Sequence, residues 1–176
     1  MRYTLTILLL VILSTAFAQK RVNPVIKNFG GIYDIPEATV RPDPNQEYKI
    51  VIDVYGGTDD KVKVDRSLNN VARMLNLHAV GGVDPGNMKV VLALHAKSTY
   101  SILDDESYKE KFGSPNPNIA LVRELKKAGV RITVCGQSLR GREVENSQVL
   151  TEVEIATSML TTVTSYQMKG YQLLKF

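Results

Sequence analysis

The residue best suited to chemistry in this sequence is its single cysteine, Cys135, within the segment VCGQS at residues 134–138. A cysteine reacts as its thiolate, and backbone N–H groups, a helix N-terminus or a nearby cation lower the pKa of the thiol. Gly136 permits a sharp turn that exposes N–H groups, and Ser138 is suited to cap the turn that follows. Cys135 is therefore a candidate nucleophile. An inert thiol buried at the end of a strand explains the same segment equally well.

His95 is the second candidate, because it directly follows an almost uninterrupted apolar run at residues 88–94. A histidine at such a place is able to accept a proton from a nearby thiol or to orient it. Taken alone, a histidine bonded to the backbone at a strand end is the simpler interpretation. Neither His95 nor His78 has partners at the spacing of metal ligands, so we expect no metal and no cofactor.

Known catalytic motifs narrow the possibilities. The sequence lacks nucleotide-binding glycine loops, a Cys-x-x-Cys pair and a Gly-x-Ser-x-Gly elbow. A phosphatase-type loop is excluded, because neither Arg140 nor Arg142 follows Cys135 at the required spacing. The four residues between Cys135 and Arg140 do match a rhodanese-type persulfide loop. The rest of the chain does not resemble a rhodanese.

Strands and helices alternate along the chain, which predicts an α/β fold with a parallel sheet covered by helices on both faces. β-Branched and apolar runs indicate strands, and apolar residues at helical spacing indicate the helices between them. Asn116 is the expected N-cap of the second long helix, with Pro117 as its first residue. The expected strands are 48–54, 88–94, 130–134, 153–156 and 171–174, and the expected helices are 65–80, 116–129, 139–147 and 159–169.

Ligands of parallel sheets bind beyond the carboxyl ends of the strands. That edge should hold Gly56 and Gly57 after the first strand, His95 after the second and Cys135 after the third. Because the second and third strands should be neighbours, we expect His95 beside Cys135.

The N-terminus has the three parts of a secretory signal peptide. Arg2 gives a positive start, residues 5–13 form a short apolar core, and Ala16 and Ala18 are the small residues before a cut at Gln19. The core is short for a bilayer span of about 20 residues, although an uncleaved anchor is the alternative. We expect a periplasmic or secreted protein with no stable membrane anchor after cleavage. Residues 19–47, rich in proline, should form an irregular arm before the domain at 48–176.

The net charge of the whole chain is +4, and acidic and basic residues are evenly mixed. No helix carries a basic stripe, and aromatic and basic residues do not alternate. We therefore expect ordinary solvated charge and no nucleic-acid partner.

Several ordered segments together resemble the DsrE/DsrF-like family. They are the strand VVLALH ending at His95, the segment NPN at residues 116–118 before a helix, the strand leading to VCGQS, and a final helix followed by KGY at 169–171. The resemblance covers roughly residues 48–176. It implies a three-layer α/β/α sandwich with a mainly parallel five-stranded sheet, assembled as trimers or hexamers. Ala96 stands where that family commonly has glycine.

The resemblance also implies sulfur-relay chemistry, in which Cys135 carries a persulfide and His95 tunes its protonation. Gly136, Gln137, Ser138 and Asn118 would then bind the transferred group, and the partners would be a sulfur donor or acceptor protein. The family's relay members work in the cytoplasm, whereas this protein is expected to be exported. The resemblance therefore supports the fold more strongly than the function. The alternative is a non-enzymatic oligomeric module of the cell envelope that binds a small ligand or protein and has a structural cysteine.

Overall fold

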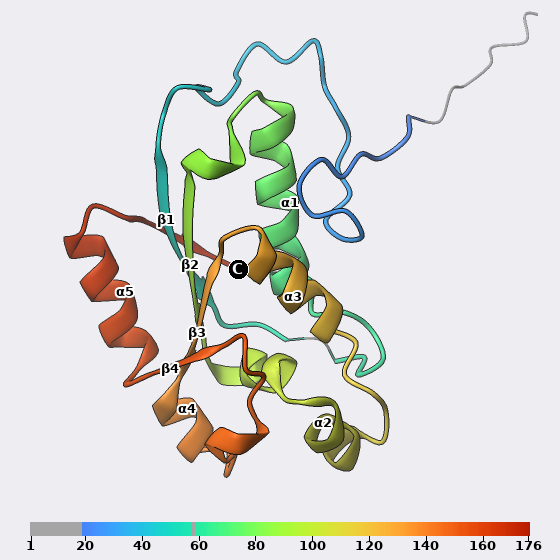
Figure 1. The fold of residues 1–176 in the computed structure, drawn as a ribbon, viewed down its shortest axis with the longest axis vertical. Coiled ribbons are helices and arrows are strands. Elements are labelled where there is room, and N and C mark those ends of the chain that lie inside the picture. Colours follow the sequence, from blue (N-terminus) through green and yellow to red (C-terminus); the bar gives the residue numbers. More distant parts are fainter. Residues whose placement is uncertain (1–18, 58) are drawn as a thin grey trace, which may run out of the picture.

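The computed structural model describes residues 19–57 and 59–176, so the expected signal peptide at residues 1–18 lies outside the described part. The helices and strands follow the alternation expected from the sequence (Figure 1). Three short 3-10 helices, Pro85–Asn87, Ala96–Ile102 and Asn146–Gln148, lie in the connections. In chain order the main elements are β1 (Tyr48–Val54), α1 (Arg66–Val80), β2 (Met88–Leu94), α2 (Asp105–Phe112), α3 (Ile119–Lys127), β3 (Arg131–Cys135), α4 (Gly136–Arg140), β4 (Glu154–Ala156), α5 (Met159–Met168) and β5 (Gln172–Lys175).

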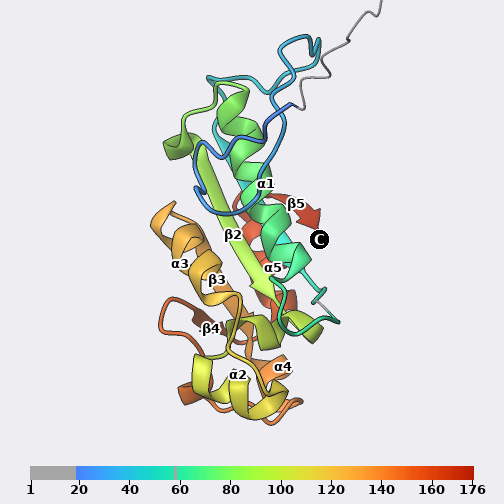
Figure 2. The same cartoon turned by 90° about the vertical axis from the view of Figure 1, so that its right-hand side faces the viewer.

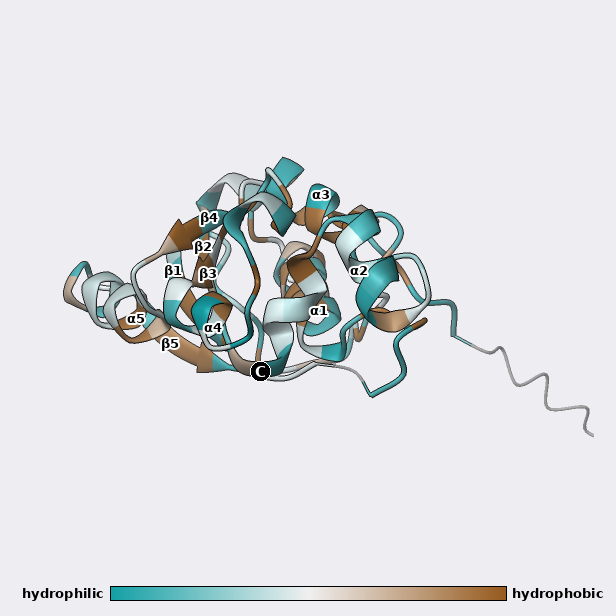
Figure 3. Cartoon of the chain, turned by 90° about the horizontal axis from the view of Figure 1, so that it is seen from below, coloured by the Kyte–Doolittle hydropathy of each residue, from teal (hydrophilic) through white to brown (hydrophobic). Residues whose placement is uncertain are grey.

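The five strands form one parallel sheet in the order β4-β3-β2-β1-β5. Helices α1 and α3 cover one face of the sheet, and α5 covers the other (Figures 1 and 2). Seen along the sheet, apolar strands lie between these two helical layers (Figure 3). The fold is thus the expected α/β/α sandwich.

Alternation along the strands divides the core into two parts. Ile50, Ile52 and Val54 of β1 point into the larger cluster beneath α1 and α3, whereas Val51 points toward α5. Helix α1 contributes a stripe of fully buried side chains that includes Leu68. By the same alternation, residues at odd positions near the ends of β1 and β3 lie on the α5 face.

The arm at residues 19–47 lies against α1 (Figures 1 and 2). Its backbone is held by Asn76, a fully buried side chain of α1. Asn76 accepts hydrogen bonds from the N–H groups of Val25 and Ile26 and donates to the carbonyls of Phe29 and Gly30. One asparagine therefore satisfies four backbone groups of a segment that has little regular structure of its own.

Two helices begin where the sequence did not place them. Helix α3 begins at Ile119 with Asn118 as its N-cap, not at Pro117 after Asn116. Asn116 nevertheless accepts the N–H of Asn118 at 2.9 Å, as a capping residue would. Helix α4 begins at Gly136, directly after β3, rather than at Leu139.

Within residues 19–57 and 59–176, no helix is both long and apolar enough to span a bilayer.

Candidate functional site

Cys135 is the last residue of β3 and also the N-cap of α4. A second helix, α5, begins nearby with Ser158 as its N-cap, and the Cys135 thiol donates a long hydrogen bond of 4.0 Å to Ser158 Oγ. The N-termini of two helices thus meet at the sulfur, which is where helix dipoles favour negative charge. The side chain is 6% exposed, so the sulfur lies just beneath the surface.

Hydrogen bonding sets the protonation of this thiol. Burial raises the pKa of Cys135, but the backbone N–H of Met159 and both the hydroxyl and N–H of Ser138 lower it, with a further contribution from the Ser158 hydroxyl. These donors outweigh burial, and the pKa of Cys135 lies below its ordinary value. The surroundings of the sulfur therefore favour the thiolate, the form that acts as a nucleophile.

His95 is held by a carboxylate that sequence reasoning missed. Its Nε2 lies 2.6 Å from Oδ1 of Asp53, the penultimate residue of β1, and both side chains are mostly buried. Because an ionised carboxylate only accepts hydrogen bonds, Nε2 is the donor in this contact. Tyr55 packs edge-on against the imidazole at 5.3 Å, and Lys175 Nζ lies 3.7 Å from the other carboxylate oxygen of Asp53. The sequence signal for Asp53 was a charged residue inside an otherwise apolar strand.

The sheet brings His95 and Cys135 to neighbouring positions. Strands β2 and β3 are paired so that Leu94 lies opposite Val134, and His95 and Cys135 are the next residues along each strand. No hydrogen bond joins the two side chains in the described part of the chain. Ser138 lies between the two segments: its Oγ accepts the N–H of Ala96 at 3.3 Å, and the same hydroxyl lowers the pKa of Cys135.

Ala96 has a φ of 50°, in the left-handed region that favours glycine. A glycine at this position would adopt the same conformation without strain. The turn after His95 thus forms although residue 96 is an alanine, and the Ala96 N–H donates to Ser138.

The remaining predicted site residues divide into two groups. Gly136 lies at the site, where a Cβ atom would come within 2.9 Å of the Ala156 carbonyl, so a side chain is excluded by close packing. Gln137 is exposed in the first turn of α4. Asn118 is not brought to the sulfur: it is fully buried, accepts the N–H of Asp65 and donates to Asn116, and so joins α1 to α3.

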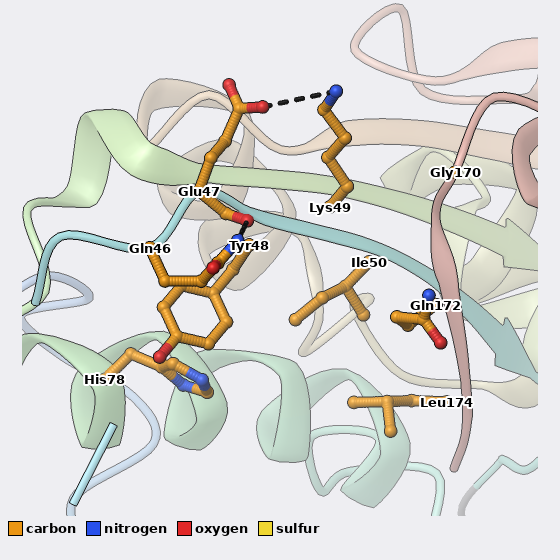
Figure 4. Close-up of a pocket in the computed structure, with 9 residues that line it drawn as sticks. All are labelled: Gln46, Glu47, Tyr48, Lys49, Ile50, His78, Gly170, Gln172 and Leu174. Atoms are coloured by element: carbon orange, nitrogen blue, oxygen red, sulfur yellow. Dashed lines mark hydrogen bonds and ion pairs between the residues drawn. The ribbon is translucent and has the colours of Figure 1, made fainter. Parts of the chain in front are cut away.

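A separate cavity of about 630 Å³ lies at the opposite end of the sheet, where β1 and β5 begin (Figure 4). His78 lines it, with its ring edge-on to Tyr48 at 4.8 Å. This cavity is not part of the Cys135 site, since the two lie at opposite ends of parallel strands. Within the described residues, no group of three or more histidine, cysteine, aspartate or glutamate side chains is arranged to hold a metal ion.

The fold and the site define a class: a parallel three-layer α/β domain in which the inner strand β3 ends at a thiol whose pKa is lowered by N–H and hydroxyl donors. Residues 49–176 match the sequence model of the DsrE/DsrF-like family, and the chain belongs to that family.

Solved structures agree with this fold. A protein of unknown function from Methanobacterium thermoautotrophicum, MTH1491, has a TM-score of 0.54 and 18% identity, and the match covers 73% of this chain and 99% of that one. The ychN protein from E. coli has the same TM-score and coverage with 20% identity. At these identities the likeness concerns the fold alone. A search of curated proteins finds no match.

Proposed function

We propose that this protein is a sulfur carrier or sulfurtransferase in which Cys135 holds the sulfur as a persulfide. The observation that carries the proposal is the set of N–H and hydroxyl donors around the sulfur, which lowers the pKa of Cys135 against the effect of burial. Membership of the DsrE/DsrF-like family supports sulfur as the cargo.

The transfer needs no external oxidant. The Cys135 thiolate attacks the terminal sulfur of a donor persulfide, a new S–S bond forms, and the S–S bond of the donor breaks. The donor leaves as its thiolate, and Cys135 holds the sulfur as a persulfide. An acceptor thiolate then attacks that terminal sulfur in the same way and regenerates the Cys135 thiolate.

Each neighbour has a distinct part in this chemistry. Met159 N–H and Ser138 stabilise negative charge on the sulfur. His95 tunes the protonation of the site from the neighbouring strand, and Asp53 is a positioning residue that fixes the imidazole. Gly136 and exposed Gln137 directly follow Cys135 at the start of α4 and are the proposed binding residues for the transferred group.

Alkylation tests the state of the thiol. Iodoacetamide should label the folded protein below about pH 7, and Cys135→Ser should abolish the label. A low-molecular-weight persulfide should then add the mass of one sulfur atom to the Cys135 peptide. Asp53→Asn should slow the second reaction and leave the fold intact. Resistance to labelling until the protein unfolds would instead establish the alternative, a binding module with a structural cysteine.

We further propose that the protein is exported, with cleavage before Gln19. The arrangement of residues 1–18 supports this, with a positive start, a short apolar core and small residues before Gln19. The N-terminal sequence of protein recovered from the periplasm or medium of an expressing bacterium should begin at Gln19. Recovery of the full-length chain only in the cytoplasm would refute export.

We also propose a homo-oligomer, a trimer or a hexamer. Apolar side chains are exposed on the last two elements: Leu160 and Met168 of α5 are 68% and 88% exposed, and Leu173 and Leu174 of β5 are partly exposed. A second copy that covers them removes this surface from water. Light scattering should give a mass of several chains, and Met168→Glu with Leu173→Glu should lower it. A stable monomer at micromolar concentration contradicts the assembly.

A further inference from the structure

Three arginines meet at a cavity outside the Cys135 site and largely outside the family's matched region. Arg21 comes from the arm, and Arg66 and Arg73 come from α1. All three line one cavity of about 510 Å³. Arg66, Asn69 and Arg73 recur at intervals of three and four residues, which places them on one face of α1. Asn76 holds the arm against α1. Arg21 of the arm therefore lines the same cavity as the two arginines of α1.

None of these three guanidinium groups forms an ion pair or donates a hydrogen bond to another described residue. The Arg21 guanidinium lies over the ring of Tyr33, with 5.3 Å from its Cζ to the ring centroid. By contrast, Arg123 and Arg131 elsewhere on the surface pair with Glu152 and Glu154. Like charges placed together without acidic partners oppose folding, and a bound anion relieves that repulsion.

The groups around the arginines favour an anion that also carries an apolar part. The Asn69 side chain accepts the Gly30 N–H, and its amide nitrogen has no acceptor among the described residues. Phe29 and Val64, both half-buried, give the cavity an apolar wall.

Two carboxylates lie close to this region, and neither cancels its charge. Glu124 hydrogen-bonds Asn28 at the edge of the cavity and reduces the positive potential there. Asp65 is buried beside Arg66, where it caps α1 and accepts a hydrogen bond from the Ser101 hydroxyl. It does not line the cavity.

We propose that this cavity binds a phosphate or sulfate group carried on a small molecule with an apolar part. The guanidinium groups supply paired N–H donors that match a tetrahedral oxyanion. The remainder of the ligand rests against Phe29 and Val64. This function is independent of sulfur transfer at Cys135.

The test is an amide NMR titration of the protein with inorganic phosphate, inorganic sulfate and phenyl phosphate. The amides of Gly30, Gly31 and Asn69 should shift saturably, with a Kd of about 1–10 mM for the inorganic ions. Phenyl phosphate should bind more tightly, because its ring contacts the apolar wall. Chloride at equal ionic strength should produce no saturable shift.

The variant Arg66→Gln with Arg73→Gln should weaken binding about tenfold. The matched control, Arg123→Gln with Lys109→Gln, removes the same charge from other surfaces and should leave the Kd unchanged. Unaltered arm resonances in the first variant will show that docking of the arm persists. Absence of saturable shifts overturns the proposal, as does equal weakening in the control. If the protein cosediments with phosphatidylglycerol vesicles but does not bind phenyl phosphate, the small-molecule proposal is wrong and the cavity binds a membrane surface instead.

Discussion

Ser138→Ala should raise the pKa of Cys135 by about one unit. The Ser138 hydroxyl is one of the donors that stabilise the thiolate, and the substitution removes it while leaving the N–H groups of Ser138 and Met159 in place. A hydrogen bond to a charged group is worth about 1.5 kcal/mol, and one pKa unit corresponds to about 1.4 kcal/mol. The substitution also removes the acceptor of the Ala96 N–H, so the turn after His95 should loosen.

The assay is the rate of iodoacetamide alkylation as a function of pH, from about pH 5 to about pH 9. Cys135 is the only cysteine, so the rate reports one thiol. The midpoint for Ser138→Ala should lie about one unit above that of the unaltered protein. Ser165→Ala, on the exposed side of α5, is the matched control and should not move it. An unchanged midpoint in Ser138→Ala would refute the assignment of this hydroxyl as a thiolate donor.

Three further predictions concern stability. Asn76→Ala leaves the N–H groups of Val25 and Ile26 and the Gly30 carbonyl without partners among the described residues, and should lower the free energy of unfolding by about 2–4 kcal/mol in thermal melts. Asn70→Ala, whose side chain has no hydrogen bond to the described residues, should change it little. Ala96→Gly relieves a left-handed φ and should raise the free energy of unfolding by a net of about 0.5–1 kcal/mol, seen as a higher Tm. A lower Tm would show that the turn is unstrained. The folded-state pKa of Cys135 is depressed, so its thiolate contributes stability that is fully present above the unfolded pKa of about 8.5 and is lost as pH falls through the folded pKa. Urea midpoints should therefore rise with pH across that window in the unaltered protein, and Cys135→Ser should lack the rise.

Strands β1 and β2 were predictable because both are mostly apolar or β-branched runs with few charged residues. Residues 48–54 and 88–94 form strands at the positions expected. Helix starts were less predictable. The sequence indicated Asn116 as the cap, whereas α3 begins after Asn118, whose side chain accepts a long-range hydrogen bond from the Asp65 N–H and does not cap the helix. The start of α4 carried no conventional capping residue, because Cys135 itself takes that position.

The candidate site was predictable in outline only. The rule for parallel sheets placed His95 and Cys135 at one edge, and the pairing of β2 with β3 puts them on adjacent strands. Asp53 and His95 are far apart in sequence, and only the register of β1 against β2 brings their side chains together. The same holds for the arginine cavity: Arg21 is distant in sequence from α1, so an even mixture of charge along the chain concealed a local concentration.

The donors around Cys135 bear directly on the choice between a reactive and a structural thiol. A structural cysteine is neutral and apolar in its packing, and burial alone keeps it so by raising its pKa. Cys135 is buried to a similar degree, yet Met159 N–H and Ser138 favour its ionised form. Donors of this kind add nothing to the packing of a neutral thiol, because S–H is a weak hydrogen-bonding group. They do stabilise a sulfur anion as it forms or departs, and this is the charge that both halves of a persulfide exchange place on Cys135.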